Sequence, residues 1–309
     1  MLTIGIIGLG DIAQKAYLPV ITQLVDVEPV FCTRNRETLE ALAQQYRVDK
    51  YCVDYRQLLE LGVDAVMIHA ATFAHTEIAS FFLQHGVATF VDKPLADSAA
   101  DVERLYELSV KYHCPLYVGF NRRHIPLYND HIPELANGDL GQLTSLRWEK
   151  HRFDHAGEIR TFVFDDFIHP LDSINLNRKS DLSDVYVTHQ MSGRLLSRLD
   201  VQWQAGGALL HASMNRQFGI TRERVSASYQ NVALEFDSFV GGKKWQQAGE
   251  QSLMLKDWTP MLASKGFENM IADWLRVVEC GQVASSVIDR NIATHQLAEA
   301  LTSKLEALL

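Results

Sequence analysis

Short apolar runs alternate with helical patterns along residues 1–120. In the helical patterns apolar side chains recur three or four positions apart, as at Leu39, Leu42 and Tyr46, and this spacing places them on one face of a helix. Strand-like runs that alternate with such helices predict a doubly wound parallel sheet covered by helices. The predicted strands are 3–7, 28–32, 65–69, 87–91 and 116–118, and the predicted helices are 36–46, 75–85 and 98–112.

From residue 121 the pattern changes to longer β-rich stretches in which polar and apolar residues alternate. Strands that follow one another without helices predict a mostly antiparallel sheet, open on one face. The predicted strands are 143–153, 184–191, 195–204, 208–216 and 225–236, and two amphipathic helices at 266–279 and 290–308 close the chain. The sequence thus predicts an α/β domain in residues 1–120 and an α+β domain in residues 121–309.

Composition and charge narrow the class of protein. The 309 residues are enough for two domains, and 47% hydrophobic with 22% charged residues is typical of a folded globular chain. With 29 basic and 38 acidic residues the formal charge is −9, so we expect no nucleic-acid partner. We find neither a signal peptide nor a membrane-spanning apolar run. The four cysteines lack the spacing of a zinc site, and a reducing cytoplasm is expected.

A glycine-rich run follows the first predicted strand and opens a helix. In Gly8-Leu9-Gly10-Asp11-Ile12-Ala13, Gly8 permits a tight turn, Gly10 lets the backbone approach a pyrophosphate, and Ala13 allows close helix packing. The helix amides would then hold the anion, as in a Rossmann domain. The alternative is a glycine-rich turn without a ligand. The predicted cofactor-binding residues are Gly8, Gly10, Asp11, Ile12 and Ala13.

The end of the second strand distinguishes NAD from NADP. An NAD site usually has a carboxylate there for the ribose hydroxyls. This chain has Thr33-Arg34-Asn35-Arg36 instead, and a guanidinium group with a nearby hydroxyl suits a phosphate. We therefore expect Thr33 and Arg34 to bind the cofactor and NADP to be preferred over NAD. In the alternative interpretation, Arg34 and Arg36 are solvated residues at a helix start.

Two further segments carry candidate chemistry. Asp92-Lys93-Pro94-Leu95 places a lysine at the carboxyl edge of the sheet, where open α/β folds bind ligands. Asp165, His169 and Asp172 are spaced i, i+4 and i+7, which puts all three on one face of a helix. Such a face lines a polar site or, alternatively, is solvated with a local Asp165–His169 pair. Whether Asp165 or Asp166 points inward depends on the phase of the helix.

At these residues the chain resembles the Gfo/Idh/MocA family of NAD(P)-dependent oxidoreductases, and the resemblance covers essentially its whole length. The runs 10–16, 92–95 and 119–123 look most like the bacterial branch called MviM-like virulence factor. The resemblance implies that Lys93 assists proton transfer. Asp92 stands where the family has glutamate, and the resemblance implies that both Asp92 and Lys93 lie near the cofactor. It further implies that Asp165 and His169 form the acid–base pair, and it selects Asp165 over Asp166.

The resemblance also implies contacts around the reacting groups. The family often has a histidine near the nicotinamide, preceded by Thr-Pro; this chain has Ala71-Thr72-Phe73-Ala74 before His75. We expect Ala71, Thr72 and His75 to bind the cofactor, and a helix-capping role for His75 fits equally well. In the second domain, the segment from Lys150 to His155 could recognise an acidic or hydroxyl-rich substrate. The predicted substrate-binding residues are Asn121, Arg122, His151 and Asp172.

These residues predict oxidation of an alcohol, or its reverse, on a sugar, a polyol or a related hydroxy or keto compound. His169, oriented by Asp165, would take the hydroxyl proton while Lys93 stabilises the oxygen, or Lys93 would itself be the base. No metal is expected, because the twelve histidines occur without a Cys or Glu cluster. The family implies a homodimer through the open sheet, whose apolar rows we place in residues 195–216.

Two other functions remain open on the same fold. One is a dinucleotide-sensing regulatory protein without catalysis, since a cofactor loop does not demonstrate turnover. The other is NAD-dependent cleavage of a glycoside, a chemistry known among relatives of the family. The combination of Lys93, Asp165 and His169 argues against a sensor, because a sensor needs no acid–base set.

Overall fold

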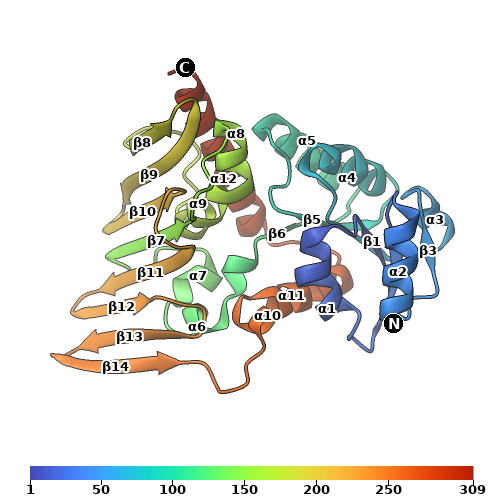
Figure 1. The fold of residues 1–309 in the computed structure, drawn as a ribbon, viewed down its shortest axis with the longest axis horizontal. Helices are drawn as coiled ribbons and strands as arrows, with labels where there is room; N and C mark the ends of the chain where they lie inside the picture. The colour runs from blue at the N-terminus through green and yellow to red at the C-terminus, as the bar shows by residue number, and fades with distance from the viewer. Residues whose placement is uncertain (309) are drawn as a thin grey trace. The chain divides into compact units, whose positions relative to one another are not determined.

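The structure is a computed structural model that describes residues 1–308. It divides into two units, and the division does not follow a single boundary along the chain. Unit 1 comprises Met1–Gly119 and Phe267–Ala284, and unit 2 comprises Phe120–Gly266 and the C-terminal segment from Ser285. Figure 1 shows the elements of both units along the chain.

A six-stranded parallel sheet forms the centre of unit 1, in the order β3-β2-β1-β4-β5-β6. This is the strand order of a Rossmann fold, so the predicted fold class is confirmed for this unit. The two-residue strand β3 escaped prediction because so short a strand has no periodicity. The strands are β1 (Leu2–Ile7), β2 (Val27–Cys32), β3 (Tyr51–Cys52), β4 (Ala65–Ile68), β5 (Ala88–Asp92) and β6 (Leu116–Gly119).

Two helices of unit 1, α2 and α5, begin at side-chain caps. Asn35 accepts a hydrogen bond from the Thr38 amide at 3.0 Å, and Ser98 accepts one from Asp101 at 3.2 Å, which satisfies amides at two helix starts. The predicted bounds of these helices agree with the structure to within one residue. The segments are η1 (Ala13–Tyr17), α1 (Leu18–Ile21), α2 (Arg36–Tyr46), α3 (Gln57–Glu60), η2 (Thr72–Ala74), α4 (His75–Gln84) and α5 (Ala99–Lys111).

Helix α11 (Phe267–Cys280) belongs to unit 1 although it is remote in sequence. The Trp274 side chain is fully buried, with its ring 5.9 Å from that of Phe90 and 5.7 Å from that of Tyr117. The Tyr117 hydroxyl also donates to Asp273 at 2.9 Å. The division therefore differs from the predicted one at residue 120, because packing of an apolar helix face, not proximity in sequence, assigns α11 to this unit.

Unit 2 is built on an eight-stranded sheet in the order β14-β13-β12-β11-β7-β10-β9-β8. Its strands pair antiparallel except β7 with β10 among the described residues, which confirms the mostly antiparallel prediction. The predicted strand 225–236 is a hairpin that turns at Asn231, where φ is +60°. The strands are β7 (Ser145–His151), β8 (Tyr186–Ser192), β9 (Leu195–Ala205), β10 (Ala208–Asn215), β11 (Arg222–Tyr229), β12 (Val232–Phe236), β13 (Gly241–Gln246) and β14 (Gly249–Met254).

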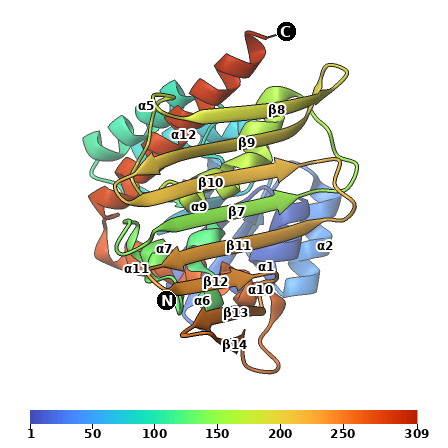
Figure 2. The ribbon, with the colours of Figure 1, turned by 90° about the vertical axis from the view of Figure 1, so that its left-hand side faces the viewer.

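Helices cover one face of this sheet and leave the other open (Figures 1 and 2). On the covered face lie α8 (Ile159–Thr161), α9 (Ile168–Ile174) and α12 (Ser285–Glu306). The remaining segments of unit 2 are η3 (Asn121–His124), α6 (Pro126–Asn129), α7 (Pro133–Asn137), η4 (Phe162–Phe167) and α10 (Met261–Ser264). Among the helices of residues 1–308, none has the length and hydropathy to cross a membrane.

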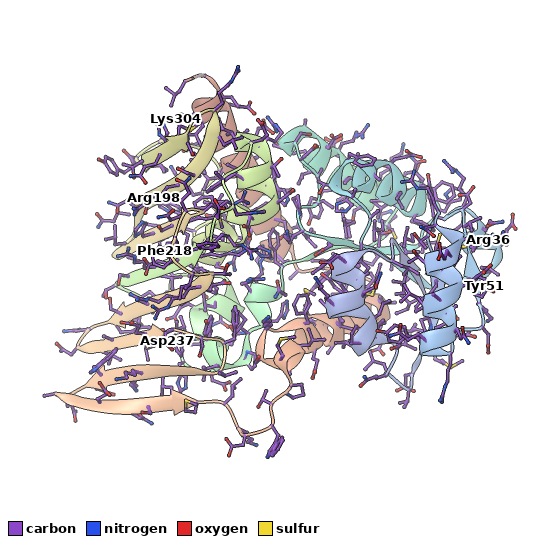
Figure 3. All side chains as sticks on the ribbon, viewed as in Figure 1. Arg36, Tyr51, Arg198, Phe218, Asp237 and Lys304 are labelled. Carbon is purple, nitrogen blue, oxygen red and sulfur yellow. The ribbon has the colours of Figure 1, made fainter. Side chains whose placement is uncertain are left out.

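The open face of the sheet is polar. Along β9 the buried side chains Leu199, Val201 and Trp203 alternate with Arg198 and Asp200, and Figure 3 shows Arg198 on the side away from the helices. The Arg198 guanidinium pairs with Asp200. The predicted apolar rows therefore exist, but the chain's own helices cover them. The expectation that an apolar face awaits a second subunit is wrong.

Candidate active site

The phosphate-binding loop has the backbone geometry that its glycines require. Gly8 has φ of +87°, and a Cβ there would lie 2.6 Å from the Ala70 nitrogen, so another residue cannot replace it without strain. A Cβ on Gly10 would meet nothing within 4 Å, which leaves room over the loop. Ala13 is fully buried, as helix packing requires. The loop geometry thus fits a pyrophosphate.

The helix after this loop begins with amides directed at the loop. The first amide to bond within the helix is that of Gln14, which donates to the Gly10 carbonyl at 3.1 Å. The amides of Asp11, Ile12 and Ala13 precede it and have no partner within the helix. The Asp11 carboxylate is exposed and pairs with Lys15 at 2.6 Å. These amides form the anion-binding end of the helix, so Asp11 and Ile12 would contribute backbone, not side chains.

The end of β2 lies directly beside the phosphate loop. The Gly8 amide donates to the Cys32 carbonyl at 2.9 Å, which ties the first residue of the loop to the last residue of β2. Thr33 is half-buried and Arg34 is exposed, and Arg34 forms no ion pair with any residue of the range 1–308. Its guanidinium is therefore available to a ligand. That it binds the ribose phosphate of NADP stays a prediction.

His75 holds two loops together. Its Nδ1 lies 2.9 Å from the Pro94 carbonyl oxygen and its Nε2 lies 2.9 Å from that of Ala70, and its side chain is only 2% exposed. The ring thus bonds the loop after β4 to the loop after β5. No side chain caps the start of α4, which differs from the capping interpretation, and contact between His75 and a cofactor stays a prediction. Ala71 and Thr72, in the loop that His75 anchors, stay predicted cofactor contacts.

Asp92 orients the backbone at Lys93. The Asp92 Oδ1 accepts hydrogen bonds from the Tyr17 hydroxyl at 2.8 Å and from the Lys93 amide at 2.9 Å. The Tyr17 ring stacks on His69 at a centroid distance of 3.9 Å. Burial, helped by the charge of His75, lowers the pKa of His69 to about 3. The sequence analysis missed Tyr17 and His69, because no spacing rule links a helix residue to the end of another strand.

A π-helical turn changes which aspartate points inward in unit 2. The segment η4 is a π-helix, and its extra residue per turn shifts the side chains that follow. Asp166 is 6% exposed, whereas Asp165 is exposed. Ideal α-helical spacing predicted that Asp165, His169 and Asp172 share one face. In the structure His169 and Asp172 are buried and Asp165 is exposed, so the three do not form one buried stripe. The catalytic roles of Asp165 and His169 stay predictions.

Asp166 is the centre of a buried charged cluster. Its carboxylate pairs with Lys150, and with Arg152 and Arg216 at 3.1 Å each. Burial would raise the pKa of Asp166, but the charges of Lys150 and Arg152 overcome it and hold this pKa far below its ordinary value. For Lys150 burial has the opposite sign: it lowers the pKa of the ammonium group, and the negative charge of Asp166 only partly offsets this. Arg216 reaches Asp166 from just beyond β10, and no motif or spacing in the sequence indicates this contact.

Asp172 lies in a second buried charged cluster of unit 2. It accepts hydrogen bonds from Arg123 at 2.9 and 2.6 Å and from Thr294 at 3.2 Å, and it has no exposed surface. Burial would raise its pKa, but Arg123 and Arg290 hold this pKa below its ordinary value. The carboxylate joins α9, η3 and α12, and its contact with a substrate stays a prediction.

His151 lies on the open face of the sheet, away from the helices. Successive residues of a strand face opposite sides, so the buried Lys150 points to the covered face and His151 to the other. The His151 Nδ1 accepts from the Asn215 amide at 3.0 Å, and its ring lies 4.5 Å from that of Phe218. Contact between His151 and a substrate stays a prediction.

Asn121 and Arg122 are also engaged within unit 2. The Asn121 Nδ2 donates to the Lys265 carbonyl at 2.8 Å, and its Oδ1 accepts from Arg122 at 3.0 Å. Arg122 donates to both carboxylate oxygens of Glu223, at 3.2 and 2.9 Å. Trp148 donates to the same carboxylate at 2.8 Å. These bonds fix both side chains, and their contact with a substrate stays a prediction.

The arrangement of these residues indicates which cofactor and which metal ligands the chain could provide. The open space at Gly10, the helix amides and the exposed Arg34 fit a dinucleotide in unit 1. Within residues 1–308 no group of three or more His, Cys, Asp or Glu side chains is arranged to hold a metal ion. Lys93 belongs to unit 1 and His169 to unit 2, and the approach of one to the other stays a prediction.

Comparison with protein families and curated proteins agrees with this geometry. The family model described as "Oxidoreductase family, NAD-binding Rossmann fold" matches residues 2–120, and NAD or NADP fits such a domain. The Salmonella typhimurium protein YceM is 30% identical over 97% of this chain and 97% of its own length. Myo-inositol 2-dehydrogenase of Thermotoga maritima is 32% identical over 47% of this chain and 43% of its own length.

Solved structures extend the similarity to the whole fold. A Gfo/Idh/MocA family oxidoreductase from Vibrio cholerae is 62% identical, with a TM-score of 0.98 over 100% of this chain and 99% of its own. The dehydrogenase MviM from Clostridium difficile is 26% identical, with a TM-score of 0.87 over 100% and 99% of the two chains. The chain therefore belongs to the Gfo/Idh/MocA family of oxidoreductases.

Proposed function

We propose that this chain is an NADP-preferring dehydrogenase or reductase that acts on a CH–OH group of a sugar, a polyol or a related hydroxy or keto compound. The observation that carries the proposal is the position of Lys93 at the carboxyl end of β5, in the same sheet edge as the Gly8–Gly10 loop after β1. Ligands of open α/β sheets bind at this edge. The substrate class is supported by similarity to a myo-inositol dehydrogenase over part of the chain.

The chain's own residues would handle the proton and the charge on oxygen. The Lys93 ammonium donates a hydrogen bond to the reacting oxygen and stabilises the negative charge that develops there. His169 accepts the hydroxyl proton in the oxidative direction and returns it in reduction. A bound nicotinamide supplies the hydride acceptor or donor. Asp92, fixed by Tyr17, orients the backbone from which Lys93 extends.

Cofactor preference rests on Arg34. Its exposed guanidinium, free of ion pairs within residues 1–308, follows the strand end that is bonded to the phosphate loop. A planar fork of donors suits a phosphate better than a pair of hydroxyls.

For partners, we propose a homodimer that uses the polar open face of the unit 2 sheet. We also propose that the protein acts in the cytoplasm.

The test combines binding with turnover. Thermal shift with NADP, NAD and their reduced forms identifies the cofactor, and a panel of sugars and polyols then identifies the substrate. Lys93→Ala should leave the cofactor-induced shift in place and reduce kcat by about 10³-fold, while Lys111→Ala, an exposed lysine on α5, should change neither. Full turnover in Lys93→Ala would reject the proposal. Cofactor binding without turnover on any substrate would favour a sensor, and aglycone release without net cofactor consumption would favour glycoside cleavage.

A further inference from the structure

Two cysteines occupy directly paired positions at the ends of neighbouring strands in unit 1. Cys32 is the last residue of β2 and Cys52 the last residue of β3, and the two are partners in the parallel register. Neighbouring strands lie about 4.8 Å apart, and paired positions in a parallel sheet direct their side chains to the same face. This separation lies within the range of Cα distances that a disulfide spans.

The two thiols affect each other's pKa, and both are buried, with Cys52 in the wall of a cavity. The Cys32 thiol donates a hydrogen bond to the Cys52 sulfur, which lowers the pKa of Cys52 against the opposing effects of burial and Asp54. The same hydrogen bond and burial raise the pKa of Cys32. Cys52 lines a cavity of about 310 Å³ that also has Arg36 and Tyr51 in its wall. Figure 3 shows these last two residues on the same part of unit 1.

The pair is connected to the proposed cofactor site through the backbone. The Cys32 carbonyl accepts the 2.9 Å hydrogen bond from the Gly8 amide, and the next residues along the chain are Thr33 and Arg34. A disulfide would cross-link the end of β2, which the segment carrying Arg34 follows directly, to the end of β3.

We propose that Cys32 and Cys52 form a peroxide-sensitive dithiol, and that its closure to a disulfide weakens dinucleotide binding. The effect on binding rests on the proposed function; the bond itself does not. No other pair of the four cysteines shares this arrangement, since Cys114 precedes β6 and Cys280 is the last residue of α11.

The chemistry is balanced with hydrogen peroxide as the oxidant. The Cys52 thiolate attacks one peroxide oxygen, an S–O bond forms, the O–O bond breaks, and the leaving hydroxide takes a proton to become water. Cys32 then loses its proton and attacks the sulfenic sulfur, so that the S–S bond forms, the S–O bond breaks and a second water leaves. Two thiols lose two electrons, and one peroxide becomes two waters.

The experiment separates bond formation from its consequence. Full-length protein is reduced, treated with hydrogen peroxide and digested without reductant, and the peptides are analysed by mass spectrometry. We expect a peptide pair that links Cys32 to Cys52, with the mass of two hydrogens lost. The dissociation constant of NADPH, measured by calorimetry, should rise about tenfold or more on oxidation and return to its original value with dithiothreitol.

Matched variants control the assignment. Cys52→Ser should bind NADPH like the reduced protein and should no longer respond to peroxide, whereas Cys280→Ser should respond like the parent chain. If Cys52→Ser does not fold, blocking Cys52 in the folded parent with methyl methanethiosulfonate tests the same point. Absence of the linked peptide overturns the proposal, and so does a linked protein whose NADPH affinity is unchanged. If the reduced protein binds no dinucleotide at all, the proposed function fails, and the peptide map still decides whether the bond forms.

Discussion

The two units use their charged residues in opposite ways. At the strand ends of unit 1, Arg34 is exposed and the space above Gly10 is open. In unit 2, Asp166 and Asp172 are buried and each is held by at least two cations. Arg34 in unit 1 is thus available to a ligand, whereas Asp166 and Asp172 in unit 2 form buried ion pairs that stabilise the fold. Spacing in the sequence does not distinguish these two roles.

The largest expected effect concerns the aspartates of the unit 2 motif. Asp172→Ala leaves Arg123 and Arg290 buried without their carboxylate, so it should lower the free energy of unfolding by about 4 kcal/mol. Asp165→Ala, at an exposed position, should change stability by less than about 0.5 kcal/mol and should reduce turnover. Chemical denaturation monitored by circular dichroism measures both. Equal stability losses would remove the distinction between the buried and the exposed aspartate.

Acid should destabilise both units through one buried histidine in each. Burial lowers the pKa of His69 in unit 1 to about 3 and that of His295 in unit 2 to about 4, below the unfolded value of about 6.5. Between these values the unfolded chain takes up protons that the folded chain does not, so stability falls as the pH falls. At pH 5 each histidine should cost about 2 kcal/mol relative to pH 7.5.

Denaturation curves from pH 7.5 to 5 test this expectation. His69→Phe should reduce the pH dependence by about half and keep the ring stacking on Tyr17, while His131→Phe offers a control histidine that is not fully buried. A pH dependence that is unaltered in His69→Phe would show that His69 is not protonated selectively in the unfolded chain.

The smallest expected effect concerns cofactor selection in unit 1. Arg34→Ala should weaken NADP binding about tenfold, by loss of a charge-assisted hydrogen bond worth about 1.4 kcal/mol, and should leave NAD binding nearly unchanged. Arg36→Ala is the matched control, because Arg36 already lies 3.7 Å from Glu40. Calorimetric titration with both dinucleotides measures the ratio. A parallel loss for NAD and NADP would mean that Arg34 does not contact the ribose phosphate.

The sequence analysis succeeded where the signals are local. The apolar periodicity predicted α2 and α5 to within a residue. Prediction from the sequence failed where the direction of a side chain depends on helix or strand phase, or on packing against distant residues. The π-turn in η4 exchanged the positions of Asp165 and Asp166, and one step of strand phase placed His151 on the open face of the sheet. Strands β13 and β14 escaped prediction because their side chains are mostly exposed and lack an apolar row.

Local order along the chain was sufficient for the phosphate loop, the alternation of strands and helices in unit 1, and the β-rich character of unit 2, because caps, periodicity and glycine geometry act over a few residues. Other features exist only in the folded chain: the transfer of α11 to unit 1, the commitment of Asp172 to Arg123 and Arg290, the polar open sheet, and the pairing of Cys32 with Cys52. Each of these depends on which distant residues meet, and burial and register, not neighbouring sequence, determine that.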